Sequence, residues 1–204
     1  MAHQGAIRND SESGSEDLRA RVLRVATQLF ADRGFVGTSV REVAEAAGCT
    51  KPALYYHYQS KQGLFLAALR AQAEALGEPI ERACCAEGSV RQRLTEAVRA
   101  VVGYARSDPH GLLLLYRASR HPEEGQPDFD FASVQEAPLA MARTLLAEGL
   151  ERGELRPELD LEDAVFALQG LVDQRCCSFI SGGKAISDDF PERALALLFD
   201  GVGR

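Results

Sequence analysis

The sequence predicts an all-α fold of about nine helices, in which a small unit of three helices precedes a larger helical bundle. Three observations support this prediction. Apolar residues recur at intervals of three and four from residue 18 onward, and no convincing stretch alternates as a half-buried strand would. Capping signals and glycines divide the pattern into separate helices. A chain of 204 residues is also long enough for a small module fused to a larger domain.

The N-terminal region divides into a polar tail and a first helix. Residues 1–15 are rich in Ser, Glu and Gly, so we expect a disordered tail. The first helix follows it, carries an apolar face from Leu18 to Phe30, and stops near Gly34. The arginines outside this face are expected to be a solvated surface: Arg19, Arg21 and Arg24.

Two short helices follow and meet across a tight turn. Ser39 with Glu42 forms a capping box, which predicts a helix over about residues 40–47. Thr50 can cap the next helix, where Pro52 lies in the first turn and needs no intrahelical amide partner. This arrangement is typical of a helix-turn-helix.

The rest of the chain shows the same combination of caps and apolar stripes. Its helices are expected at about residues 61–77, 89–106, 111–118, 134–152, 161–180 and 189–201. Three of them have capping signals: Ser89 with Gln92, Ser133 with Glu136, and Asp160 with Asp163. We place the domain boundary after the third helix, so residues 16–61 form the first domain and residues 62–204 the second.

The charges are distributed unevenly. The net charge is −7, but residues 18–61 contain seven basic and three acidic side chains. Because affinity for DNA depends on local neutralisation of phosphates, this distribution indicates a DNA-facing module on an acidic body. No stretch resembles a membrane span or the apolar core of a signal peptide, so we expect a cytoplasmic protein without a membrane partner.

The five cysteines are expected to be reduced thiols. The adjacent pairs Cys84-Cys85 and Cys176-Cys177 lack the spacing of a metal chelate, because neighbouring helical residues point about 100° apart. Thiol or metal sensing stays open as an alternative to buried small side chains. We expect no metal and no cofactor.

Residues 34–66, GFVGTSVREVAEAAGCTKPALYYHYQSKQGLFL, resemble the DNA-binding signature of the TetR family. Gly48 makes the turn of the motif, and the aromatic run from Tyr55 to Tyr58, followed by Lys61, matches the ending of that signature. The resemblance implies a helix-turn-helix DNA-binding domain plus a C-terminal helical bundle for dimerisation and ligand binding. It also implies a transcriptional regulator, which we expect to be a repressor.

The expected DNA-contacting residues fall into two groups. The first turn of the third helix has small or flexible side chains, which lets it approach base edges in the major groove. The resemblance implies base contacts from Arg41, Thr50, Lys51 and Ala53, and phosphate contacts from Thr38, Tyr55, His57 and Lys61. The Ser39 hydroxyl at a helix N-terminus is a further phosphate candidate. Tyr56 is also placed in the interface, although both Tyr56 and Tyr58 are expected to contribute to packing, Tyr58 against the first and fourth helices.

The last two helices are too apolar around their circumference to face water on all sides. In the TetR family the corresponding helices pair with their copies, so the resemblance implies a homodimer through about residues 161–202 and a palindromic operator. Apolar residues with a few polar ones suggest a cavity for a mainly apolar small-molecule effector that releases the DNA. Its expected lining is Tyr104, Tyr116, Arg117, Met141, Phe166, Gln169 and Asp173; ordinary core packing is the alternative.

Two other functional classes compete with this interpretation. An enzyme is not expected, because nothing resembles a nucleophile elbow, a phosphate loop or paired catalytic carboxylates. An architectural DNA-binding protein that senses nothing would not need so large an apolar C-terminal domain.

Overall fold

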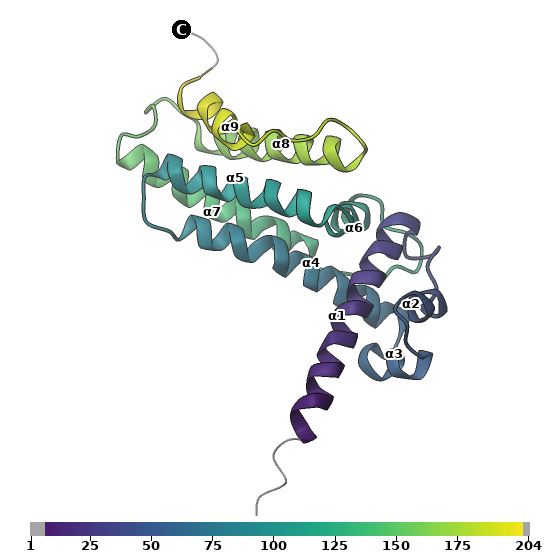
Figure 1. Cartoon of the computed structure of the whole chain (residues 1–204). Helices are drawn as coiled ribbons and strands as arrows, with labels where there is room; N and C mark the ends of the chain where they lie inside the picture. The colour runs from purple at the N-terminus through teal and green to yellow at the C-terminus, as the bar shows by residue number, and fades with distance from the viewer. Residues whose placement is uncertain (1–6, 202–204) are drawn as a thin grey trace, which may run out of the picture. The chain divides into compact units, whose positions relative to one another are not determined.

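The computed structural model describes residues 7–201, with side chains from residue 17 onward, and these residues form nine helices and no strand (Figure 1). The all-α prediction is confirmed. The helices are α1 (Ile7–Arg33), α2 (Val40–Ala46), α3 (Lys51–Tyr58), α4 (Lys61–Cys84), α5 (Val90–Ser107), α6 (Pro109–Arg120), α7 (Phe131–Glu151), α8 (Leu161–Ile180) and α9 (Phe190–Phe199). Within residues 7–201, no helix is both long and apolar enough to cross a membrane.

The described chain folds into two compact units. The first unit contains residues up to 72 together with residues 113–129, and the second contains residues 73–112 and those from 130 onward. Both divisions fall inside helices, so α4 and α6 each contribute residues to both units. The domain boundary after residue 61 stays a prediction.

The first unit is built around an aromatic cluster. Phe65 of α4 meets the Phe30 and Phe35 rings edge-on, with centroids 4.9 Å and 5.1 Å away. Aliphatic side chains from α1, α2, α3 and α4 are also buried: Val22, Ala26, Val43, Leu54, Leu64 and Leu69. One buried polar pair joins α1 to α4, where the Gln72 amide donates to the Thr27 hydroxyl at 3.1 Å. These contacts fix the helices that carry the turn between α2 and α3.

Local capping signals define α2 and α3 as the sequence predicts. Ser39 accepts the Glu42 amide while the Glu42 carboxylate accepts the Ser39 amide, which completes the capping box. The hydrogen bonds from Ser39 lower the pKa of Glu42, as suits a carboxylate at the positive end of a helix. Thr50 accepts the Ala53 amide at 3.3 Å and caps α3. Between the two helices, Gly48 adopts φ 64°, where a Cβ would be strained.

Three helix boundaries differ from the expectation. α1 begins at Ile7, so residues 7–15 are helical rather than part of a disordered tail; residues 1–6 lie outside the described chain. Extending a helix is easier than nucleating one, which explains how a polar segment continues a helix anchored by the core. α4 continues through Pro79 to Cys84. α7 is capped by Asp130, which accepts both the amide and the hydroxyl of Ser133, so Ser133 lies inside the first turn.

The second unit is a bundle of α5, α7, α8 and α9 with the last part of α4. Its core is aliphatic and includes Val90, Leu94, Val98, Leu145, Leu146, Val165 and Leu195. Arg93 of α5 joins two neighbours: its Nη1 lies 2.9 Å from both carboxylate oxygens of Glu148 in α7, and its Nε donates to the Cys84 carbonyl at 2.9 Å. Along the other side of α5, Arg91 pairs with Asp200 and Arg99 with Glu192 of α9.

The residue after α3 is conformationally strained. Gln59 has φ 61° and ψ −37°, a region that side chains other than glycine rarely occupy. We therefore expect Gln59→Gly to raise the free energy of unfolding by about 1 kcal/mol, which corresponds to a melting temperature higher by about 2–4 °C. Gln62→Gly is the matched control, because Gln62 is an exposed residue in the first turn of α4 and should lose stability. Differential scanning calorimetry measures both variants, and a lower melting temperature for Gln59→Gly would show that the turn is not strained.

Candidate nucleic-acid interface

The first turn of α3 is open to solvent. Thr50, Lys51 and Pro52 are all exposed, and Ala53 behind them is half-buried. Leu54 and Tyr58, one turn apart, are buried and hold the opposite face of α3 against the rest of the unit. The helix therefore presents its N-terminal end with small or flexible side chains, which is the geometry that reading base edges in a major groove requires.

The aromatic run divides between surface and core. Tyr58 is buried, and its hydroxyl donates to the Arg19 carbonyl of α1 at 3.2 Å, which confirms its packing against the first helix. Burial raises the pKa of Tyr58. Tyr55 is 45% exposed and Tyr56 is 84% exposed, so the expectation that Tyr56 packs is wrong. Tyr56 comes two positions before the buried Tyr58, and this spacing places it on another side of the helix. Its ring lies edge-on to His57, with centroids 5.2 Å apart.

The hydroxyls before α2 are occupied within the protein. Thr38 is 2% exposed and donates to the carbonyls of Leu29 and Gly34 at 3.1 Å and 2.9 Å. Its side chain closes the connection between α1 and α2, which corrects the expectation that this hydroxyl faces a phosphate. The Ser39 hydroxyl is exposed but donates to the Glu42 carboxylate at 2.7 Å. A phosphate at this position would have to replace that contact.

Two cations lie near these elements, of which Arg41 is exposed and Lys61 is half-buried. Arg41 of α2 pairs with Glu45 at 2.7 Å, and its side chain is 70% exposed. Such an exposed pair contributes little to stability, so the guanidinium can be redirected to a stronger partner. Lys61, at the start of α4, donates to the Val36 carbonyl at 3.4 Å, and its ammonium lies 4.4 Å from the centroid of the Phe35 ring.

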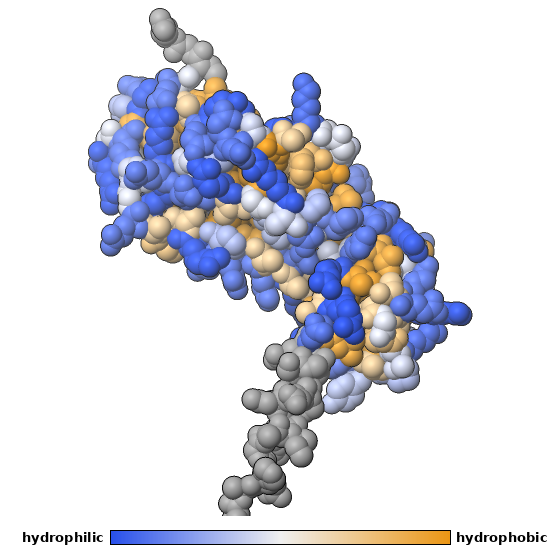
Figure 2. Space-filling view, in the orientation of Figure 1, coloured by the Kyte–Doolittle hydropathy of each residue, from blue (hydrophilic) through white to orange (hydrophobic). Residues whose placement is uncertain are grey.

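Apolar side chains interrupt the hydrophilic surface of this unit (Figure 2). Val36, in the connection between α1 and α2, is 63% exposed, and Tyr55 and Tyr56 are the exposed aromatic residues of α3. Arg21 of α1 stabilises the end of α2. Its Nε donates a hydrogen bond to the Ala47 carbonyl at 2.8 Å. Sequence reasoning placed Arg21 on a solvated face, because the contact joins residues 26 positions apart and leaves no local signal.

The expected effector residues in the first unit are Tyr116 and Arg117. Arg117 donates to the carbonyls of Ala31 and Asp32 at the end of α1, at 3.2 Å and 3.1 Å. It also pairs with Glu123 at 3.2 Å. Arg117 is therefore a structural anchor in this structure, since helix C-termini carry carbonyls in need of donors. Tyr116 is half-buried, with the guanidinium of Arg120 4.8 Å from its ring centroid.

The other five expected effector residues lie in the second unit. Tyr104 is buried, which raises its pKa, and Met141, Gln169 and Asp173 are half-buried. Phe166 is 63% exposed on α8, so it does not line an enclosed cavity within this chain. The helical period of α8 places Phe166 and the buried Leu168 on different faces.

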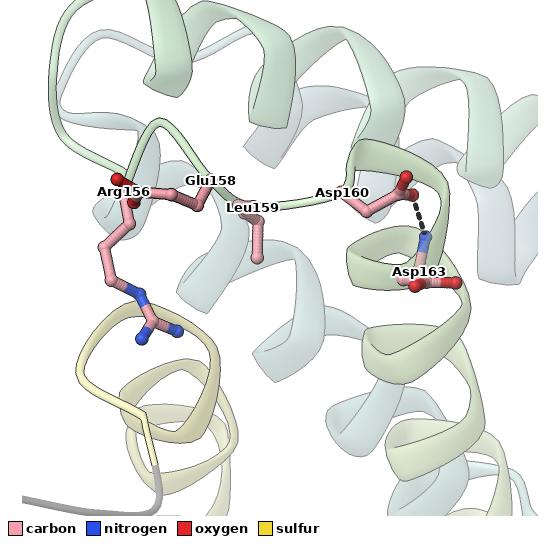
Figure 3. A pocket seen from close by; sticks show the side chains of 5 residues that line it. All are labelled: Arg156, Glu158, Leu159, Asp160 and Asp163. Atoms are coloured by element: carbon pink, nitrogen blue, oxygen red, sulfur yellow. Dashed lines mark hydrogen bonds between the residues drawn. The ribbon is translucent and has the colours of Figure 1, made fainter.

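A hollow of about 360 Å³ in the second unit involves none of these residues. It is lined by Arg156, Glu158, Leu159, Asp160 and Asp163 (Figure 3). Its polar groups do not converge: the Asp160 carboxylate accepts the Asp163 amide at 3.0 Å, whereas Arg156 extends toward the end of α9. Small-molecule sites are mostly apolar with a few convergent polar groups, so this hollow does not fit the expected effector.

The cysteines are free thiols in different environments. Cys84 and Cys176 are buried, whereas Cys85 is exposed and Cys177 half-buried, so the members of each adjacent pair differ in access to solvent. Burial raises the pKa of Cys176 to about 11, so this thiol is protonated at neutral pH. Among the described residues, no three His, Cys, Asp or Glu side chains gather in a way that could hold a metal ion.

Comparison with known sequences identifies the DNA-binding region. The family model described as bacterial regulatory proteins, tetR family, matches residues 22–68. The repressor KstR2 of Mycolicibacterium smegmatis is 25% identical over 95% of this chain and 94% of its own length. The activator FasR of the same organism is 32% identical over 112 residues, which span 55% of this chain and only 51% of FasR. These relatives are transcriptional regulators rather than enzymes.

Solved structures share the fold along most of the chain. FadR of Bacillus subtilis, determined in complex with stearoyl-CoA, has a TM-score of 0.70 and 18% identity, with 91% of this chain and 100% of FadR covered. AibR, determined with isovaleryl coenzyme A and operator DNA, has a TM-score of 0.72 and 22% identity, with 90% and 98% covered. The solved structures show the shared fold. The match over residues 22–68, the similarity to KstR2 along nearly the whole chain and the helix-turn-helix geometry identify the chain as a DNA-binding transcriptional regulator of the TetR family.

Proposed function

We propose that the chain is a repressor that binds a palindromic operator as a homodimer and is released by a mainly apolar small molecule. The observation that carries the DNA-binding part is the open first turn of α3, held in place by the buried Leu54 and Tyr58. KstR2, which matches nearly the whole chain, is named a repressor, whereas the activator FasR matches over about half its length. Repression is therefore the better supported direction of control.

The residues of the interface take two roles in this proposal. Base contacts come from Thr50 and Lys51 in the first turn of α3, and Ala53 provides a small contact surface beside them. Arg41 also contacts a base, after its guanidinium leaves Glu45. Phosphate contacts, which position the module without reading sequence, come from Ser39, Tyr55, Tyr56, His57 and Lys61. Thr38 is not among them, since its side chain is buried and its amide donates to the Phe35 carbonyl.

Titration of labelled DNA tests the proposal directly. The intergenic region upstream of the gene is compared with a shuffled duplex of the same length and composition, at physiological salt, by fluorescence anisotropy. We expect tighter binding of the natural sequence, by at least about a thousandfold for a specific regulator. Equal affinity for the two duplexes would refute operator recognition. Deletion of the gene then gives the direction of control: expression of the regulated gene rises for a repressor and falls for an activator.

Two lysines should separate affinity from specificity. We expect Lys61→Ala to weaken binding to all sequences alike and to lower the slope of log affinity against log salt by about one. Lys51→Ala should instead change the preference among operator variants, with about 1–3 kcal/mol of discrimination lost at one base pair. Lys184→Ala, which removes an exposed lysine of the second unit, is the control and should leave both quantities unchanged. An unchanged salt slope for Lys61→Ala would contradict its assignment to a phosphate.

The effector part of the proposal is supported by two solved structures with the same fold. FadR and AibR were each determined with an acyl-coenzyme A, so acyl thioesters are the first compounds to screen. Within the second unit, the residues proposed to meet the acyl chain are Tyr104 and Met141, with Gln169 and Asp173 as polar partners. A thermal-shift screen finds binders, and operator titration with each binder tests release. A tenfold loss of operator affinity needs a difference of only about 1.4 kcal/mol in the binding of the effector to the two states. Compounds that bind without changing operator affinity would refute control by that ligand.

A further inference from the structure

Glu123 follows α6 but contacts the connection between α1 and α2, 87 positions earlier in the chain. The Val36 amide donates to its Oε2 at 2.7 Å. The side chain is 22% exposed, and its other oxygen lies near Gly34. A Cβ at position 34 would come within 1.7 Å of that oxygen, so a glycine is required for the carboxylate to take this place. Both residues belong to the first unit.

Arg117 holds this carboxylate in position. Its guanidinium pairs with Glu123 at 3.2 Å and donates to the carbonyls of Ala31 and Asp32. The guanidinium therefore connects the end of α1 to Glu123, whose carboxylate accepts the hydrogen bond from the Val36 amide. Because the planar guanidinium has donors in fixed directions, these contacts restrict where the Glu123 carboxylate can lie.

Val36 is also held through its carbonyl, which belongs to the next peptide group along the chain. Its carbonyl accepts the Lys61 ammonium at 3.4 Å, and the ammonium lies against the Phe35 ring. A lysine side chain has several rotatable bonds, and ordering it on a phosphate costs conformational entropy. A fixed acceptor near the ammonium lowers that cost, since fewer orientations remain to be lost on binding.

We propose that Glu123 is a positioning residue for DNA binding, which fixes the backbone of Val36 and so directs the Lys61 ammonium toward a backbone phosphate. This inference rests on the proposed function, in which Lys61 contacts DNA. Glu123 acts through Val36 and Lys61 and does not itself touch the nucleic acid. Its negative charge repels phosphates, so its removal has two opposite effects on affinity, and the experiment must separate them.

The exposed neighbour Glu124 provides the control. Glu124→Ala removes the same charge one position away, and should bind the operator as tightly as the natural chain or slightly more tightly. Glu123→Ala should bind about fivefold more weakly than Glu124→Ala, because the hydrogen bond from the Val36 amide is lost. Glu123→Gln should fall between them, since its amide oxygen can still accept from Val36 while the ion pair with Arg117 is gone. Affinities are measured at 25 °C by anisotropy, with thermal melts confirming that each variant is folded at that temperature.

A double-mutant cycle with Lys61→Ala tests the route of the effect. If Glu123 acts through Lys61, then in the Lys61→Ala background Glu123→Ala should bind the operator as tightly as Glu124→Ala. The full fivefold loss in that background would overturn the inference, and so would equal operator affinities for Glu123→Ala and Glu124→Ala, whatever their melting temperatures. In both cases the natural chain still prefers its operator. A natural chain without that preference would refute the proposed function, and the inference with it.

Discussion

Replacing Phe65 by alanine is expected to lower the free energy of unfolding of the first unit by about 3–5 kcal/mol. The Phe65 ring is 1% exposed and contacts both Phe30 and Phe35 edge-on. Its removal leaves a cavity between α1 and α4, loses apolar burial, and breaks two favourable ring contacts. Since a domain is stable by only about 5–15 kcal/mol, a loss of this size leaves much of the DNA-binding module unfolded at physiological temperature.

Urea unfolding followed by circular dichroism, with hydrogen exchange to locate the loss, measures this effect. The control is Tyr56→Ala, which removes an aromatic ring of similar size that is 84% exposed in the same unit. It should change stability by less than about 0.5 kcal/mol. The two variants therefore separate roles: Phe65→Ala reduces stability, whereas Tyr56→Ala reduces operator affinity in a folded protein. A loss below about 1 kcal/mol for Phe65→Ala would mean that the three rings do not form a close-packed core.

The elements that sequence reasoning predicted correctly depend on contacts between near neighbours. The Ser39–Glu42 box and the Thr50 cap each join residues three positions apart, so the pattern is visible along the chain. The aromatic run, Tyr55 to Tyr58, could not be divided into buried and exposed residues from the sequence. Four adjacent aromatic residues give no indication of which side of α3 faces the core, and Tyr56 was assigned to packing although it is exposed.

Contacts between distant segments explain the other differences. The sequence shows Thr38 as a hydroxyl near a helix start and Arg117 as a cation among apolar residues, and neither pattern indicates a distant partner. The structure uses both to satisfy backbone carbonyls near the end of α1. Helix ends leave carbonyls without intrahelical donors, and the side chain that meets them can come from 86 positions away. The contact of Glu123 with Val36 could not be predicted for the same reason, because the two residues are 87 positions apart.

Introducing a negative charge on the exposed face of α8 is expected to dissociate the proposed homodimer. This face contains Phe166, Ala167 and Gly170, all exposed, and a Cβ at Gly170 would meet open space. Leu197 of α9, a helix that packs against α8, is 47% exposed. Small residues beside a large apolar one allow a second helix to approach closely, and a charge buried there without a partner is strongly unfavourable. Leu168 is a less informative site for such a charge, because it is buried in the bundle of its own chain.

The test variant is Ala167→Glu, and the control is Ala140→Glu on α7. Both replace an exposed helical alanine by the same charged residue. Light scattering should give the 22.2 kDa monomer for Ala167→Glu and twice that mass for Ala140→Glu. Operator affinity should fall by about a hundredfold or more for Ala167→Glu alone, because two half-sites are no longer bound by one linked particle. Its thermal melt must show a folded chain, so that the loss reflects dissociation. A dimeric Ala167→Glu would place the interface elsewhere, while a monomer that keeps full operator affinity would show that the two reading heads do not depend on dimerisation for binding.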